Sequence, residues 1–370
     1  MTLRKRQVVF IMRLLTIFVI LCGLVSVVLS EESKSGSSQT TKDVPGNGTV
    51  VRVAFYDFPS IPFLGFIAAQ KLGYFEQEKI PQVELIWRKD LQTVFELLKE
   101  GKADFAVTWM GEGIRTAADG FDIVAIARLS QEATEAIYVR RDINPTYHEP
   151  RDLDGRKVGV AFRRDSNARA YFKHIGVTPV TVTFRPESGF VFNEGVVDAV
   201  IMPRFNVDVY CQYTRFRGQV RSYALSDQGI TYPEDTVFCT RAFRTQKADL
   251  CKRFMRAVWR GWETVGADRQ QGVEILASYS NHGDLPNDLF YLSQELEKWY
   301  PFLHFNKENL EENGNCNHAD FEQLRTDMIA AGLVETSKAP EFKTFFDFVG
   351  APDFLTKKRD SAKVHGEKKK

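Results

Sequence analysis

Short β-rich runs alternate with segments of helical period along most of the chain. Runs such as Val50–Tyr56 are rich in β-branched and aromatic residues and predict strands, whereas Leu91, Val94, Phe95 and Leu98 recur at helical spacing until Gly101. The predicted strands are Val50–Tyr56, Val83–Arg88, Asp104–Thr108, Ile123–Arg128, Ala136–Arg141, Lys157–Phe162, Thr181–Arg185, Asp198–Met202 and Thr236–Arg241.

The helical segments between these strands indicate βαβ units and a mostly parallel sheet. This alternation of strands and helices occurs twice along the chain, and after the last strand the pattern becomes almost wholly helical. We therefore predict an α/β protein of two lobes with a helical C-terminal extension. Lobe 1 would combine residues 50–138 with the return and C-terminal helices, 236–355, and lobe 2 would be residues 139–235. The predicted helices are Pro62–Leu72, Gly113–Ala118, Ser166–Ile175, 250–265, Gly272–Ser280, Asp288–Trp299 and Ala319–Ala331.

The N-terminal 30 residues have the pattern of an export signal. A basic head, with Arg4, Lys5, Arg6 and Arg13, precedes the uncharged run Leu14–Leu29 and a small residue at Ser30. We expect cleavage before Glu31 and an exported protein, in the periplasm or on the outer face of the membrane; an uncleaved anchor is the alternative. Residues 31–49 predict a flexible linker, and residues 356–370 predict a basic tail.

Composition narrows the possible functions. The 370 residues are 44% hydrophobic, and 49 Lys and Arg against 48 Asp and Glu leave a net charge of +1. This content favours a packed body, and the near-neutral balance argues against a nucleic-acid partner. Beyond the signal lie four cysteines with no C-x-x-C pair, which leaves three disulfide pairings or free thiols open: Cys211, Cys239, Cys251 and Cys316.

Candidate ligand contacts follow from where a parallel sheet binds its ligands, beyond the carboxyl ends of the strands and at helix N-termini. The loops at these places combine aromatic residues with hydroxyl, amide or charged groups, as a small flat or anionic solute would require. The predicted ligand-binding residues are Asp57, Phe63 and Trp109 from lobe 1 and Arg164, Ser166 and Arg204 from lobe 2.

Each of these residues also has an ordinary structural explanation. Trp109 could pack between sheet and helix, and Asp57 could cap the helix that follows it. Arg164, with Arg163, could be a solvated arginine or pair with Asp165.

Motifs for catalysis and metal binding are missing from the sequence. There is no G-x-S-x-G, P-loop or G-x-G-x-x-G after a strand, and the six histidines are scattered singly. We therefore predict no catalytic residues, no metal and no cofactor.

Five segments together resemble one family, and they occur in its order along the chain from Val50 to Leu276. They are Gly65–Phe75 (GFIAAQKLGYF), Leu98-x-x-Gly101-x-Ala103-Asp104, Gly120–Ala125 (GFDIVA), Asp152–Val160 (DLDGRKVGV) and Gly195–Ala199 (GVVDA). The pattern resembles the solute-binding proteins of ABC importers for thiamine-pyrimidine precursors, aliphatic sulfonates, taurine and nitrate. The resemblance implies a type II periplasmic-binding-protein fold whose lobes close on a solute about a hinge, with Ala136–Arg141 and Thr236–Arg241 as the crossing strands.

The sequence departs from the family at the ligand loops. Asp57-Phe58-Pro59-Ser60 stands where pyrimidine-precursor binders carry an Asn-Thr-Asn-His-like stretch, and Asp165-Ser166 replaces the usual Gly-Ser. The resemblance therefore leaves the solute open. It implies that the partners are a small-molecule solute and an ABC permease with its ATPase, and that the protein is a monomer. The alternatives are a membrane-anchored ligand sensor and a pyrimidine-forming enzyme on the same scaffold.

Overall fold

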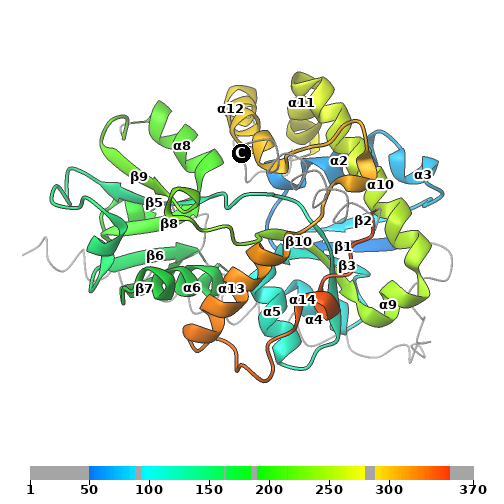
Figure 1. Cartoon of the computed structure of the whole chain (residues 1–370). Coiled ribbons are helices and arrows are strands. Elements are labelled where there is room, and N and C mark those ends of the chain that lie inside the picture. Colours follow the sequence, from blue (N-terminus) through cyan, green and yellow to red (C-terminus); the bar gives the residue numbers. More distant parts are fainter. Residues whose placement is uncertain are drawn as a thin grey trace, which may run out of the picture. The chain divides into compact units, whose positions relative to one another are not determined.

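The computed structural model describes residues 50–87, 93–161, 164–184, 190–214, 216–279 and 288–350. The predicted signal (1–30), linker (31–49) and basic tail (356–370) lie outside these residues, as does Arg163. Within them, ten strands form two five-stranded sheets flanked by helices, so the predicted α/β class is confirmed (Figure 1).

The first sheet combines four strands from the start of the chain with one that returns much later. Its order is β2-β1-β3-β10-β4, in which β1 pairs in parallel with β2 and β3, and β10 runs antiparallel between β3 and β4. The sheet is therefore mixed. The strands are β1 (Val51–Phe55), β2 (Val83–Ile86), β3 (Phe105–Trp109), β4 (Ile123–Arg128) and β10 (Asp235–Thr240).

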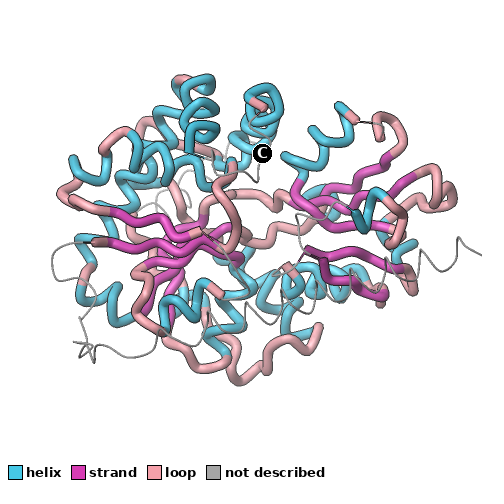
Figure 2. Tube along the Cα trace, turned by 180° about the vertical axis from the view of Figure 1, so that it is seen from behind, coloured by secondary structure: helices cyan, strands magenta, loops and turns pink. Residues whose placement is uncertain are grey.

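The second sheet has the same plan and the order β7-β6-β8-β5-β9. Strand β6 is parallel to β7 and β8, whereas β5 runs antiparallel between β8 and β9. Figure 2 shows the two groups of strands, with loops running from one to the other. The strands are β5 (Glu135–Arg140), β6 (Lys157–Ala161), β7 (Val180–Phe184), β8 (Ala199–Pro203) and β9 (Val220–Ala224).

Two segments connect the sheets, and they differ from those that we predicted. Both β5 and β10 lie wholly inside a sheet, so the strands predicted as crossings are not the connections. The chain instead passes between the sheets in residues 129–134 and 225–234, which we call the first and second crossings. The prediction was wrong because a strand within a sheet and an extended segment that crosses between two sheets have the same local residue pattern.

Three of the predicted helices, Pro62–Leu72, Gly113–Ala118 and Ser166–Ile175, are present in the first half of the chain. Predicted Gly113–Ala118 begins earlier, because β3 turns directly into α5 at Met110. Sequence analysis missed the edge strand β9, whose polar residues give no clear alternation, and the helix that precedes it. The helices that precede β9 are η1 (Ile61–Phe63), α2 (Leu64–Lys71), α3 (Tyr74–Gln77), α4 (Val94–Lys99), α5 (Met110–Ala118), η2 (Pro150–Leu153), α6 (Asp165–Ile175), α7 (Phe190–Asn193) and α8 (Arg204–Tyr213).

The second half confirms the helical C-terminal extension. The predicted helix 250–265 buries one apolar side, where Phe254, Val258, Trp262 and Val265 are fully inaccessible, and Trp262 stacks on Trp299 at 4.9 Å between ring centroids. The remaining helices are η3 (Ser226–Gln228), α9 (Arg241–Gln246), α10 (Ala248–Ala267), α11 (Arg269–Tyr279), α12 (Leu289–Trp299), η4 (Tyr300–Leu303), η5 (Leu310–Glu312), α13 (His318–Ala330) and α14 (Phe342–Phe345). In the described part of the chain, no helix is both long and apolar enough to cross a membrane.

Candidate functional site

Residues from both sheets meet where β1 and β3 end and where β10 begins. Trp109, the last residue of β3, pairs in register with Asp235, the first residue of β10. Tyr56 follows β1 directly, and its ring centroid lies 6.4 Å from that of Trp109. Because β10 is antiparallel to β3, its first residue shares the edge at which β3 ends. This edge of the first sheet therefore carries an indole, a phenol and a carboxyl group, all buried.

Arg164 brings the second sheet to this edge. Its guanidinium carbon lies 4.8 Å from the centroid of the Trp109 ring, in cation–π geometry, and its Nη1 lies 3.6 Å from Glu135 Oε1. Both charged side chains are buried, with 7% and 1% of their surface exposed. Arg164 is thus neither a solvated arginine nor the partner of Asp165, which pairs with Arg169 instead. Two of the predicted residues, Trp109 and Arg164, contact each other.

The helices α5 and α6 begin next to each other beside this pair. Ser166 Oγ donates a hydrogen bond to Glu112 Oε1 at 2.7 Å, which joins the first turns of the two helices. The approach is so close at Gly111 that a Cβ atom there would collide with the Asn167 side chain. The predicted residue Ser166 therefore lies at the contact between the two sheets, with its hydroxyl committed to Glu112.

The other three predicted residues make different contacts, although Asp57 is near enough for its charge to raise the pKa of Asp235. Asp57 Oδ1 accepts from the Phe58 amide at 3.0 Å, and the N-cap of η1 is Ser60, so Asp57 does not cap that helix. Phe63 is fully buried and packs against Tyr56 with centroids 5.4 Å apart. Arg204 begins α8, where its amide donates to the carbonyl of Thr134 in the first crossing at 2.8 Å.

Burial perturbs the acidic groups at this edge. It raises the pKa of Glu135 to about 7 and that of Asp235 to about 6, although the Arg164 guanidinium acts in the opposite direction on both. Burial also raises the pKa of Glu234, which accepts hydrogen bonds from the amide and hydroxyl of Thr134. Each of these carboxyl groups therefore keeps its proton to a higher pH than an exposed one would, and while protonated it can donate as well as accept.

Several buried polar atoms in this region lack a hydrogen-bond partner within the described residues. They are the donors Trp109 Nε1 and Asn167 Nδ2 and the acceptor Asp235 Oδ1; the Arg164 Nη1–Glu135 Oε1 pair is also longer than a hydrogen bond. A buried polar group without a partner costs about 1–3 kcal/mol. Because several such groups lie close together, we expect a bound molecule to form hydrogen bonds with them. We call Tyr56, Trp109, Glu135, Arg164, Asn167 and Asp235 the polar cluster.

Sequence analysis missed four members of the polar cluster, Tyr56, Glu135, Asn167 and Asp235. It searched the carboxyl ends of strands, but Glu135 and Asp235 are the first residues of antiparallel strands. The run Pro233-Glu234-Asp235 before a predicted return strand was the available signal, because such a strand starts at the edge where parallel ones end.

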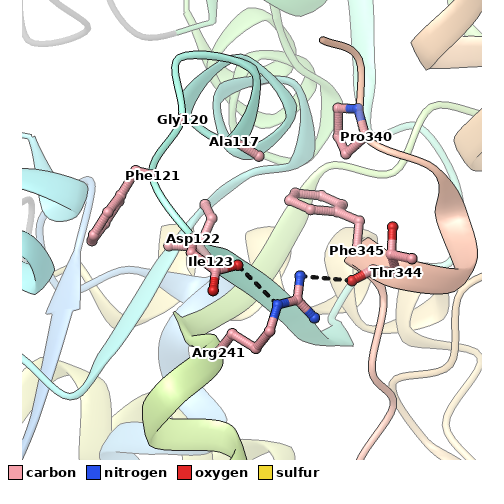
Figure 3. Close-up of a pocket in the computed structure, with 9 residues that line it drawn as sticks. All are labelled: Ala117, Gly120, Phe121, Asp122, Ile123, Arg241, Pro340, Thr344 and Phe345. Atoms are coloured by element: carbon pink, nitrogen blue, oxygen red, sulfur yellow. Dashed lines mark hydrogen bonds and ion pairs between the residues drawn. The ribbon is translucent and has the colours of Figure 1, made fainter. Parts of the chain in front are cut away.

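A separate pocket of about 210 Å³ lies at the opposite edge of the first sheet. Figure 3 shows Arg241 at its base, held by Asp122 Oδ1 at 2.8 Å and by the Thr344 carbonyl at 2.9 Å. None of the predicted ligand-binding residues lines it, and its charged groups are already paired with each other. Among the described residues, no group of three His, Cys, Asp or Glu side chains could hold a metal, and the four cysteines are free.

Comparison with known proteins identifies the family. The pattern that defines the NMT1/THI5-like family matches residues 60–271, more than half of the chain, so the chain belongs to this family. Residues 288–350 lie beyond that match. A search of curated protein sequences found no match.

Solved structures share the periplasmic-binding-protein fold. The chain is similar to the alkanesulfonate-binding protein of Xanthomonas axonopodis pv. citri bound to MOPS (TM-score 0.61, 14% identity, 82% of this chain and 99% of that chain covered). It is also similar to the periplasmic aliphatic sulphonate-binding protein of Escherichia coli (0.62, 16%, 80% and 92%). A third similar structure is the periplasmic nitrate-binding protein of Synechocystis PCC 6803 (0.56, 14%, 85% and 89%). At these identities the likeness establishes the fold, and the predicted type II periplasmic-binding-protein fold is confirmed.

Proposed function

We propose that this protein is an exported solute-binding protein that captures a small organic solute between two lobes and delivers it to an ABC importer. The two lobes would be divided at the crossings, 129–134 and 225–234, and not at residue 138, which lies inside β5 of the second sheet. The observation that carries the proposal is the polar cluster, where buried donors and an acceptor without partners lie at the contact between the two sheets. Membership of the NMT1/THI5-like family supports it.

The polar cluster favours a flat solute that both accepts and donates hydrogen bonds. Trp109 would provide the stacking surface, and Asn167 would donate through Nδ2. Asp235 would accept from a donor such as an exocyclic amine, or donate to an acceptor when protonated. A thiamine-pyrimidine precursor offers both kinds of group, whereas the sulfonate group itself offers only acceptors. Both classes remain in the proposal.

The six predicted residues would contribute to binding in different ways. Asp57, Trp109, Arg164 and Ser166 would contact the solute or the groups that hold it. Phe63 would act through Tyr56, against which it packs, and Arg204 would act through Thr134 of the first crossing, to which its amide donates. Arg164 already covers the Trp109 ring, so a stacking solute must displace the guanidinium or bind on the other face of the indole.

The first test is native mass spectrometry of residues 31–370 from an exporting host, followed by thermal shift with pyrimidines, sulfonates and carboxylates. A ligand at 100 times its Kd would stabilise the protein by about 2.7 kcal/mol. Trp109→Ala and the isosteric Asp235→Asn should each weaken binding at least about tenfold, on the scale of one lost stacking or hydrogen-bonding contact. Phe121→Ala, at the opposite edge of the same sheet, should leave binding unchanged.

The alternatives predict different results. A ligand sensor would retain Met1 as its N-terminus, whereas an exported binding protein would begin at Glu31, and N-terminal sequencing separates the two. An enzyme would turn its substrate over without a permease. A folded protein that neither carries nor binds any member of the panel would contradict the capture of these solute classes.

A further inference from the structure

Residues 289–330, which include α12, η4, η5 and α13, contact both crossings between the sheets. We call this segment the C-terminal clamp. At the first crossing, the Gln131 amide donates to the Phe302 carbonyl at 2.6 Å, and Glu132 Oε1 pairs with His304 Nε2 at 2.7 Å. The clamp therefore holds the backbone and a side chain of residues that connect one sheet to the other.

The second crossing is held by α13. Gln323 accepts from the Thr231 amide at 2.8 Å and donates to the Gly229 carbonyl at 2.8 Å, in the manner of a short strand pairing. One turn later, Asp327 Oδ2 accepts from the Tyr232 hydroxyl at 2.7 Å. Two side chains one turn apart on α13 thus hold Gly229, Thr231 and Tyr232 of the second crossing.

Arg128 joins both crossings to the clamp. It is the last residue of β4, directly before the first crossing, and only 1% of its surface is exposed. Its Nη1 pairs with Asp320 of α13 at 2.7 Å, and its Nη2 lies 3.4 Å from the Thr231 carbonyl of the second crossing. A buried charge that loses its partner costs several kcal/mol, so this junction resists rearrangement.

The clamp also contacts the helices that flank the second sheet. On one side, α13 meets α6, where His174 Nδ1 lies 2.9 Å from Asp327 Oδ2. On the other side, α12 meets α8, where the Tyr213 ring packs against Phe290 at 4.9 Å and its hydroxyl donates to Gln294 at 3.4 Å. Figure 1 shows α13 beside α6 and α12 beside α8. The clamp therefore reaches around the crossings to both flanks.

Hinge motion requires the connecting segments to change their backbone dihedral angles. Segments that are bonded along their length to a third element cannot do so freely. We propose that the C-terminal clamp sets the balance between open and closed lobes, by holding the two crossings and by bonding to α6 and α8 when the lobes are together. Its effect on solute exchange rests on the proposed function, whereas its effect on conformation does not.

The experiment measures the distance between the lobes without solute. Spin labels on exposed Lys99→Cys and Arg217→Cys, in a Cys211→Ser background, report on the first and second sheets. The pair Gln323→Ala with Asp327→Asn removes the Gln323 bonds to the second crossing and the charge that Asp327 presents to Tyr232 and to His174 of α6. We expect the population with longer label distances to rise about tenfold, the effect of losing one hydrogen bond to a charged group.

Two further variants keep the test decisive. Tyr213→Ala acts on the opposite flank from an exposed position, so it should fold even where the α13 pair does not, and it should also lengthen the distances. Thr326→Ala changes an exposed residue of α13 next to Asp327 and should give the wild-type distribution.

Unchanged distances in folded Gln323→Ala/Asp327→Asn and in Tyr213→Ala would overturn the proposal. Longer distances in a protein that binds no solute would support the clamp and leave the proposed function in doubt. Where a solute is known, the same variants should release it about tenfold faster.

Discussion

Burial of single carboxyl groups is the main electrostatic feature of this protein at the scale of residues. Glu135, Glu234 and Asp235 all have raised pKa values because they lie out of water, with Arg164 as the buried cation in their midst. Placing one charge of each sign in such a region is costly unless the groups pair well. The raised pKa values therefore indicate that the charge of this site changes at a higher pH than that of exposed carboxyl groups.

Glu295 offers the clearest test of this effect, because burial alone raises its pKa to about 7. Between about pH 4.5 and 7 the folded protein holds a proton that the unfolded chain releases, so this group's contribution to stability is full below pH 4.5 and is lost as the pH rises to 7. Glu295→Gln should therefore be about 1–3 kcal/mol more stable than the wild type at pH 8 and equal to it at pH 4.

The measurement is urea unfolding across this pH range. Glu297→Gln is the control, because Glu297 lies two residues further along α12 and its side chain is exposed. Its stability should follow the wild-type pH profile. A Glu295→Gln profile that also runs parallel to the wild type would contradict the assigned cause.

At the scale of elements, the closest packing lies between α2 and α10. A Cβ atom on Gly261 would overlap the carbonyl oxygen of Gly65, and one on Gly65 would overlap the Trp262 ring. The two helices approach so closely only because both positions lack a side chain. This contact fastens the helix that follows β1 to the longest helix of the return segment.

Gly261→Ala should therefore destabilise the protein, although alanine is the better helix former. We expect a loss of about 1–3 kcal/mol or more in the free energy of unfolding, since the backbone cannot yield as a flexible side chain would. Lys252→Ala, at an exposed position of α10, should change stability by less than about 0.5 kcal/mol. Equal stabilities of the two variants would show that the helices can separate at little cost.

The edge and centre of each sheet should also differ in local stability. Strand β10 is hydrogen-bonded on both sides, by β3 and β4, whereas β9 is an edge strand paired with β5 alone in its sheet. Amide hydrogen exchange should thus be slowest in β10 and distinctly faster in β9. Equal protection of the two strands would contradict this order.

At the scale of the whole molecule, the contacts of the C-terminal clamp join two sheets that each have their own helices. Arg128, Gln323 and Asp327 link the crossings to α13, so the sheets share one set of stabilising contacts. We expect urea unfolding followed by circular dichroism and by tryptophan fluorescence to give coincident transitions.

In the Gln323→Ala/Asp327→Asn variant, the unfolding transitions followed by circular dichroism and by tryptophan fluorescence should no longer coincide. All five tryptophans of the chain precede α13, and four of them, all but Trp299 in α12, lie in or beside strands of the first sheet or in α10, whereas circular dichroism reports on both sheets. Coincident transitions in the variant would mean that other contacts suffice to couple the sheets.

The sequence by itself determined most of the strands and helices and the family. Alternating and helical periods are local properties of the chain, and Ile123–Arg128 was predicted with the bounds that the structure has. The five family segments also lie within short stretches of sequence. Trp109 and Arg164 were found because a strand end and a helix start mark the edge of a parallel sheet.

Only the tertiary structure decided which residues meet. Glu135 and Asp235 joined the polar cluster because their strands run antiparallel, and direction in a sheet depends on partners far away in the chain. The crossings were likewise misplaced, because pairing rather than local pattern separates a sheet strand from a connection. The role of residues 289–330 could not be predicted for the same reason. Their hydrogen bonds reach residues about 90 to 190 positions earlier, and no local spacing in the sequence indicates such contacts.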